Sequence, residues 1–327
     1  MRVRAYSAMV MRASGTVHSA RGLGLHDHVC WSYDDGAEFR RHAREFLAEG
    51  LTLGQSVCYI GDGSADALAV DLCAAAGMDR ALRQGAARVV PVGDVCRPDA
   101  VIEPEAQAAA YALATEKALS KGFAGLRIAA DVTTLVRRPA QRDAFARHEH
   151  LMDRHMTARP FAALCGYDRA ELGDAAVAEL ACLHPNTNRP APLFRLYAST
   201  DLECAAELAG ELDIVSTELF PLALRHVDPG AAGRRVVLDA SRVSFIDHRS
   251  LIALDDHARE RGATVVLRTD LFTPARVIEA LDLACVRVEW QSSPECPATS
   301  GPNPRDGTAR RLRHRGLRGG RPAGQRR

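Results

Sequence analysis

Short apolar runs alternate with longer segments of helical periodicity along most of the chain. Residues 56–60, 126–131 and 161–167 read as buried strands, because they are short, apolar and bounded by turn-forming or charged residues. Helical patterns follow at residues 65–76 and 139–156. Strands that alternate with helices in this way pair in parallel, and the helices cover both faces of the sheet. The alternation therefore predicts an α/β fold.

A break in composition divides the chain. Residues 184–192 contain three prolines and two asparagines, which do not continue a helix. A chain of 327 residues is also long enough for two domains. We therefore predict a larger first domain at residues 22–186, a linker at 187–192 and a smaller α/β domain at 193–291.

The ends of the chain and its cysteines predict which segments are disordered, the cellular compartment, and which kinds of partner are not expected. Residues 1–21 lack a clear period, and residues 292–327 are rich in Pro, Gly and Arg, so we expect a disordered leader and tail. No apolar run is long enough to span a bilayer, and the nine cysteines include no C-x-x-C pair. We expect reduced thiols in a cytoplasmic protein that does not bind membranes. The arginine-rich tail has no interleaved aromatic residues, so direct binding of nucleic acid is not expected.

Residues 234–254 form the most informative stretch of the second domain. An apolar strand ends at Asp239, a short loop follows, and a helix begins near Ser250. Loops at the carboxyl ends of strands are where α/β proteins present functional groups. We therefore expect this stretch to carry a binding site.

The second domain resembles a STAS domain, the fold of anti-sigma-factor antagonists. The resemblance rests on residues 210–213 (GELD), 236–239 (VVLD) and 245–247 (FID). It implies binding of an anti-sigma factor of the serine-kinase type. The residues that it assigns to the partner are Asp213, Asp239, Asp247, His248, Arg249, Ser250 and Leu251.

In that family a serine of this loop is phosphorylated, and the phosphate switches partner binding. The corresponding residue is different here. Arg249 occupies the position of the phosphorylated serine, and Ser250 occupies the position of a glycine. Because arginine does not accept a phosphate in this way, we expect partner binding without that switch. Ser250 remains open as an alternative phosphorylation site, or as a helix-capping hydroxyl.

The first domain resembles the MEDS family of sensory domains, which is related to RecA-like ATPases. The matching features are the pattern His28-x-Cys30-x-x-Tyr33, a strand that ends at Asp131, and residues 165–169 (CGYDR). The resemblance implies a RecA-like parallel sheet and a sensory role. We expect a pocket for a small ligand over the carboxyl ends of the strands. Its candidate residues are His28, Cys30, Tyr33, Gly61, Asp62, Gly63, Asp131, Cys165 and Tyr167.

The first domain contains residues that could suggest nucleotide hydrolysis or metal binding. There is no G-x-x-x-x-G-K-[ST] loop after residues 56–60, so nucleotide hydrolysis is not expected. His26, His28 and Cys30 could share one strand face, and Cys165 or His184 could add a fourth metal ligand. The spacing matches no recognised metal motif, so we predict no metal site and no cofactor.

The sequence thus predicts a non-catalytic signal-transduction regulator. Its first domain senses a ligand or a partner, and its second domain binds an anti-sigma factor and so influences transcription. The alternatives are a RecA-like protein that binds or slowly hydrolyses nucleotides, and a scaffold whose second domain only docks or forms a homodimer.

Overall fold

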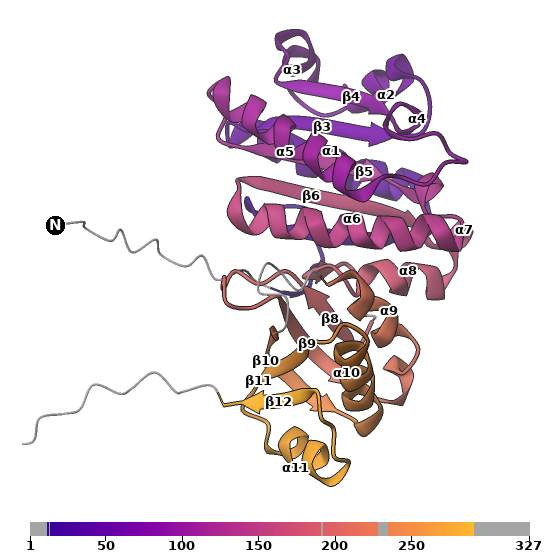
Figure 1. The fold of residues 1–327 in the computed structure, drawn as a ribbon. Coiled ribbons are helices and arrows are strands. Elements are labelled where there is room, and N and C mark those ends of the chain that lie inside the picture. Colours follow the sequence, from indigo (N-terminus) through magenta and orange to yellow (C-terminus); the bar gives the residue numbers. More distant parts are fainter. Residues whose placement is uncertain (1–11, 13, 191, 228–234, 291–327) are drawn as a thin grey trace, which may run out of the picture. The chain divides into compact units, whose positions relative to one another are not determined.

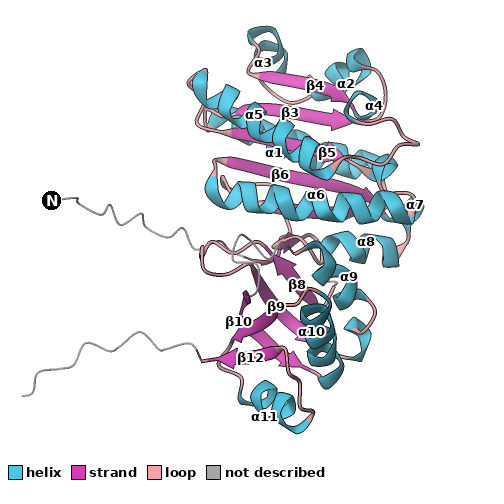
Figure 2. Cartoon of the chain, viewed as in Figure 1, coloured by secondary structure: helices cyan, strands magenta, loops and turns pink. Residues whose placement is uncertain are grey.

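The computed structural model describes residues 12, 14–190, 192–227 and 235–290 (Figure 1). Their strands form a seven-stranded sheet and a five-stranded sheet, and both sheets belong to one compact unit. Helices and strands alternate along most of the chain (Figure 2). This is the α/β fold that the alternation of apolar runs predicted. The predicted disordered tail lies outside the described residues.

The first sheet is parallel at every neighbouring pair, with the strand order β1-β7-β2-β6-β5-β3-β4. Its strands are β1 (Gly15–Thr16), β2 (His28–Tyr33), β3 (Ser56–Gly61), β4 (Ala87–Pro91), β5 (Leu126–Asp131), β6 (Phe161–Asp168) and β7 (Asn186–Thr187). The connecting helices are α1 (Gly36–Thr52), α2 (Ala65–Leu72), α3 (Met78–Gln84), α4 (Val92–Val95), α5 (Pro104–Ser120), η1 (Thr133–Leu135), α6 (Pro139–Ala158), α7 (Arg169–Leu172) and α8 (Asp174–Ala181).

Successive residues of a strand point to opposite faces of this sheet, and both faces are covered. On β2, Val29 and Trp31 pack with side chains of α1, α2 and α3. Cys30 points the other way and packs with side chains of α5, α6 and α8. His28 therefore faces α6, which is where the candidate site lies.

One glycine allows the close approach of a helix to the middle of the sheet. Gly166 of β6 lies against Phe39 of α1, and a Cβ at this position would overlap the ring of Phe39. The contact seals the face opposite the candidate site with a fully buried aromatic side chain. It thereby holds β6, which carries Cys165, tightly within the sheet.

The second sheet is mixed, with the order β12-β11-β10-β9-β8. The pair β8–β9 is antiparallel and the other pairs are parallel. The elements of this region are β8 (Phe194–Tyr197), β9 (Ala206–Leu212), η2 (Ile214–Ser216), α9 (Leu219–His226), β10 (Arg235–Ile246), α10 (His248–Glu260), β11 (Thr264–Arg268), α11 (Phe272–Ala280) and β12 (Val286–Glu289). Buried side chains of all three α-helices pack into the core with the strands.

Three observations depart from the predicted organisation. The described part of the leader is packed rather than disordered, since β1 pairs with β7 and Ala20 is buried. Thr187 belongs to β7, so the first sheet extends one residue into the predicted linker. Asp239 does not end its strand, because β10 continues to Ile246 through two shifts of register against β9.

No helix in the described part of the chain is long and apolar enough to cross a membrane.

Candidate functional site

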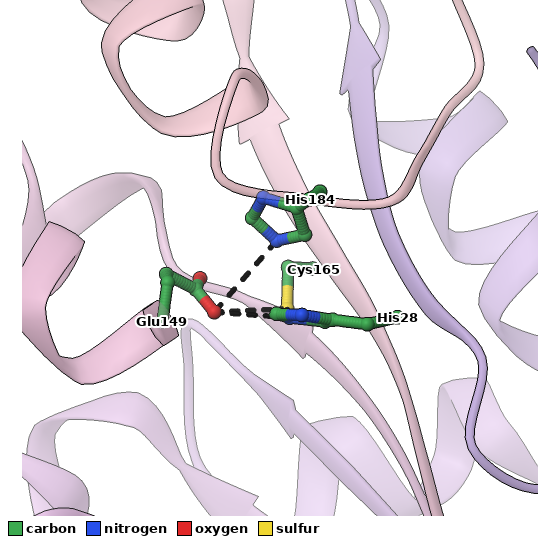
Figure 3. A group of neighbouring side chains, drawn as sticks. All are labelled: His28, Glu149, Cys165 and His184. Atoms are coloured by element: carbon green, nitrogen blue, oxygen red, sulfur yellow. Dashed lines mark hydrogen bonds and ion pairs between the residues drawn. The ribbon is translucent and has the colours of Figure 1, made fainter. Parts of the chain in front are cut away.

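Four polar side chains meet inside the first sheet region, between β2, β6 and α6 (Figure 3). They are His28, Glu149, Cys165 and His184, which we call the buried centre. Each is fully or almost fully buried, and one ligand-capable atom from each lies within 4.8 Å of the others.

The fold explains why residues so distant in sequence converge. Strands β2 and β6 are parallel neighbours whose register pairs His28 with Ala163 and Cys30 with Cys165. His28 and Cys165 thus point to the same face of the sheet. Glu149 comes from the buried side of α6, which packs on that face. His184 lies just after α8.

Glu149 contacts all three other side chains of the buried centre. Its Oε2 atom lies 3.0 Å from His28 Nε2 and 3.7 Å from His184 Nε2. Cys165 Sγ lies 4.0 Å from the same oxygen and 3.6 Å from His28 Nε2. The rings of His28 and His184 are stacked at a tilt, with centroids 4.1 Å apart.

A second carboxylate orients His28 from outside the centre. Asp153 lies one helical turn beyond Glu149 on α6 and accepts a hydrogen bond from His28 Nδ1 at 3.0 Å. The same carboxylate forms a buried ion pair with Arg12 and accepts a bond from the backbone N–H of Ala198 at 2.7 Å. Asp153 therefore connects the buried centre with the N-terminal segment and with the residue that follows β8.

Burial and pairing act in opposite directions on the protonation of these groups. Burial lowers the pKa of His28, but its hydrogen bonds to Asp153 and Glu149 raise it above the ordinary value. Burial opposes ionisation of Glu149, whereas contacts with His184 and His28 lower its pKa to about 2. Burial, reinforced by His28, lowers the pKa of His184 to about 4. Burial and Glu149 together raise the pKa of the Cys165 thiol.

A small cavity adjoins the buried centre. His28, Glu149 and Cys165 contribute to its wall, and its volume is about 40 Å³. The wall is otherwise mainly apolar and includes Ile128, Phe145, Met152, Met156 and Phe161. A volume of this size has room for about one or two water molecules or a ligand of a few atoms.

The structure separates the predicted ligand residues into two groups. His28 and Cys165 belong to the buried centre, and Tyr167 joins them because its hydroxyl donates to Glu149 Oε1 at 2.5 Å. Cys30 is the register partner of Cys165 on the same face.

The other predicted residues lie at the carboxyl ends of β2, β3 and β5. The hydroxyl of Tyr33 donates to Asp131 at 2.6 Å, and Thr133 also bonds that carboxylate. Gly61 ends β3, and Asp62 and Gly63 follow it on the surface. These residues do not line the cavity beside the buried centre.

Sequence reasoning missed Glu149 and Asp153. The signal was present, because these two acids are four residues apart on the same apolar stripe as Phe145 and Met152. Acidic residues at buried positions of a helix are rare unless they are paired. His26, by contrast, does not join the centre, and its Nδ1 atom lies 2.6 Å from the carbonyl oxygen of Met156.

In the second sheet, the residues predicted to bind a partner are not all at one surface. Asp239 lies inside β10, where its carboxylate accepts a bond from the backbone N–H of Ser241. Ser250 and Leu251 are buried, with 2% and 0% exposure. Asp247 is the N-cap of α10 and accepts from the backbone N–H of Ser250 at 2.8 Å, so the cap is not Ser250.

The remaining predicted residues do lie together. Strands β9 and β10 end side by side, since Ile246 pairs with Leu212, and Asp213 and His248 follow these ends. We define the docking surface as five of the exposed or half-buried residues after the two strands: Asp213, Ile214, Val215, His248 and Arg249. Ile214 and Val215 are 66% and 73% exposed, which adds an apolar part to a polar rim.

Comparison with known families identifies the first region. Residues 27–185 match the MEDS family, described as the methanogen/methylotroph DcmR sensory domain. This region of the chain is similar to a MEDS sensory domain. The matched residues begin immediately before His28 and end immediately after His184, so they contain the whole buried centre. No curated protein matches the chain. The STAS resemblance of residues 193–291 remains a prediction.

Proposed function

We propose that the protein is a non-catalytic signal-transduction regulator. The MEDS domain receives a signal at the buried centre or in the cavity beside it, and the second sheet binds a protein partner through the docking surface. The observation that carries this proposal is the position of Asp153. Its carboxylate is shared between His28 in the centre and the backbone N–H of Ala198, which directly follows β8 of the second sheet.

The shared carboxylate provides a physical route for a signal. A ligand that changes the charge or position of His28 changes the hydrogen bonds that remain available to Asp153. The bond to Ala198 is buried, so its loss would leave an unpaired backbone group and bias the position of β8. A ligand shifts a conformational equilibrium only if its affinity for the two conformations differs. The two conformations proposed here differ in whether the hydrogen bond from the Ala198 N–H to Asp153 is formed.

The partner that fits the resemblance is an anti-sigma factor of the serine-kinase type. The docking surface supports protein binding, because it combines exposed aliphatic side chains with the cation of Arg249. Ser250, the remaining phosphorylation candidate, is buried in α10, so a kinase would need the helix start to open before it reached the hydroxyl. We therefore propose a partner interaction that phosphorylation of this loop does not switch.

Capture of partners on the immobilised full chain tests the proposal. The unaltered protein is compared with Arg249→Glu and with a matched control, Arg276→Glu, which reverses an exposed arginine on α11. We expect the unaltered protein and the control to retain a kinase-type anti-sigma factor. Arg249→Glu should weaken its binding about tenfold, equivalent to ~1.4 kcal/mol. Recovery of no such factor, or equal recovery by all three proteins, would contradict the proposal.

A further inference from the structure

The four ligand atoms of the buried centre lie close enough together to surround one metal ion. Zinc bonds of about 2.0–2.1 Å to N or O and about 2.3 Å to S place tetrahedral ligand atoms about 3.3–3.6 Å apart. Four of the six distances within the centre are 3.0 Å, 3.6 Å, 3.7 Å and 4.0 Å, and all four atoms lie within 4.8 Å of one another. Changes of a few tenths of an ångström would bring these four distances into the range for one ion.

His184 supplies an independent indication of a ligand. Its Nδ1–H donates to the carbonyl oxygen of Leu180 at 2.9 Å, which leaves the lone pair on Nε2. This Nε2 atom is fully buried, has no hydrogen-bond partner among the described residues, and points at Glu149 (Figure 3). A lone pair that faces a carboxylate at 3.7 Å is electrostatically unfavourable unless a cation or a proton lies between them.

The outer hydrogen bonds have the pattern that supports metal ligands. Asp153 binds His28 Nδ1, so Nε2 of that ring is directed into the centre. The hydroxyl of Tyr167 binds Glu149 Oε1 and leaves Oε2 directed to the same point. Metal-ligating histidines usually donate their second N–H to a carboxylate or a carbonyl oxygen, as His28 and His184 both do.

We propose that the buried centre binds one divalent transition-metal ion of the zinc class, with His28 Nε2, His184 Nε2, Cys165 Sγ and Glu149 Oε2 as its ligands. Two imidazoles, a thiolate and a carboxylate suit a borderline-soft ion, whereas magnesium and calcium prefer oxygen ligands. The thiolate and the carboxylate together balance the two positive charges of the ion. This assignment reverses the prediction from sequence, which had neither Glu149 nor the convergence of the four residues.

The competing arrangement contains no metal. In it, a protonated His28 bridges Glu149 and Asp153 as a buried ion triad, and Cys165 remains a thiol. That arrangement leaves His184 Nε2 without a hydrogen-bond partner in the described part of the chain, and it gives Cys165 no particular function. The two arrangements differ in a measurable way, because only the metal site needs Cys165 and His184 together.

Metal content and cobalt spectroscopy of the full chain distinguish them. The protein is stripped with a chelator, loaded with Zn²⁺ or Co²⁺, separated from free ion, and analysed by mass spectrometry for metal. We expect about one ion per chain, as for a single tetrahedral site. The cobalt form should show intense visible d–d bands and a thiolate-to-cobalt charge-transfer band.

Variants assign the ligands. Cys165→Ser should lose the charge-transfer band, and His184→Gln should reduce metal retention at least about tenfold. The matched control is Cys58→Ser, which alters a buried thiol of the same sheet on β3, outside the centre. It should bind cobalt like the unaltered protein.

Two results would overturn the assignment. One is the failure of the unaltered protein to retain either ion, which decides the matter even if a variant does not fold. The other is undiminished retention by both Cys165→Ser and His184→Gln. The partner-capture experiment examines a different surface, so either proposal can fail without the other.

Discussion

The residues of the buried centre reach it from β2, α6, β6 and the segment after α8, whereas the docking surface comes from the two segments that follow β9 and β10. In the first region, tertiary packing assembles polar atoms in the interior. In the second, neighbouring strand ends present side chains to solvent. The stability of the fold should therefore be sensitive to any change of charge in the buried centre. Substitutions in the docking surface should have little effect on stability as long as α10 stays capped.

Each region also contains a buried polar atom without a hydrogen-bond partner among the described residues. In the buried centre it is His184 Nε2, and near the docking surface it is Ser250 Oγ. The imidazole nitrogen faces other possible metal ligands, whereas the hydroxyl belongs to a residue whose backbone N–H already binds the cap Asp247. An unpaired buried atom thus indicates a ligand only where other ligand atoms converge on it.

The largest effect is expected from Asp153→Ala. This substitution removes the partner of Arg12, His28 and the Ala198 N–H at once. Removal of one member of a buried ion network costs about 3–5 kcal/mol in the free energy of unfolding. Urea denaturation of the purified chain measures this loss.

The control lies on the same helix. Asp143 of α6 is exposed and forms surface ion pairs with Arg225 and His226, so Asp143→Ala should cost less than about 1 kcal/mol. Equal losses for the two alanine variants would show that the network around Asp153 has no special energetic role.

A smaller effect is expected at the start of α10. Asp247→Ala removes the side chain that caps this helix and should cost about 1 kcal/mol of stability. Asp247→Asn retains a capping oxygen and should differ from the unaltered protein by only a few tenths of a kcal/mol. Thermal and urea unfolding measure both. If the asparagine and alanine variants lose the same stability, the carboxylate acts through its charge and not through the cap.

The two regions also differ in how a histidine responds to pH. The pKa of His28 is raised between two carboxylates, whereas burial and the neighbouring Arg261 lower the pKa of His257 on α10 to about 4. Between pH values of about 6.5 and 4, the unfolded state binds more protons at His257 than the folded state does. Its contribution to stability is therefore lost as the pH falls through this window.

We expect this histidine to account for about 1 kcal/mol of the stability lost between pH values of about 7.5 and 5.5. Urea unfolding at the two pH values, compared with the same measurement on His257→Gln, isolates the contribution. An unchanged pH dependence in the variant would exclude His257 as its source.

The smallest effect is expected for Ser250→Ala. The hydroxyl of Ser250 is buried and has no hydrogen-bond partner among the residues that the structure describes, so its removal should be neutral or stabilise the protein by less than about 1 kcal/mol. Phosphate analysis of the native protein by mass spectrometry should find this residue unmodified. A modified Ser250 in a substantial fraction of the chains would show that the start of α10 opens in the cell.

The sequence was informative where function follows from local order along the chain. The stretch from Asp247 to Leu251 was predicted to begin a helix, and the structure caps α10 there. The alternation of β2 likewise placed His28 and Cys30 on one face. Asp239 was misplaced because an acid after an apolar run resembles the end of a strand, whereas β9 pairs with β10 on both sides of its bulges.

The buried centre could not be predicted in the same way. Its geometry depends on the register between β2 and β6 and on the rotation of α6 about its axis. The register joins strands more than 100 residues apart, and the rotation of α6 depends on its packing against α5, α8 and the sheet, so neither leaves a local pattern. The readable part is the pair of acids Glu149 and Asp153 within the apolar stripe of α6, but that stripe alone does not name the residues they contact.

The family match and the bonds of Asp153 also bear on where this molecule can be divided. A fragment with the limits of the match, residues 27–185, would keep every residue of the buried centre. It would lose Arg12 and the backbone N–H of Ala198, and Asp153 would retain only His28. The region recognisable in sequence is thus smaller than the region that the bonds of Asp153 join. We expect a fragment with these limits to be less stable than the full chain, because it lacks both outer partners of a buried carboxylate.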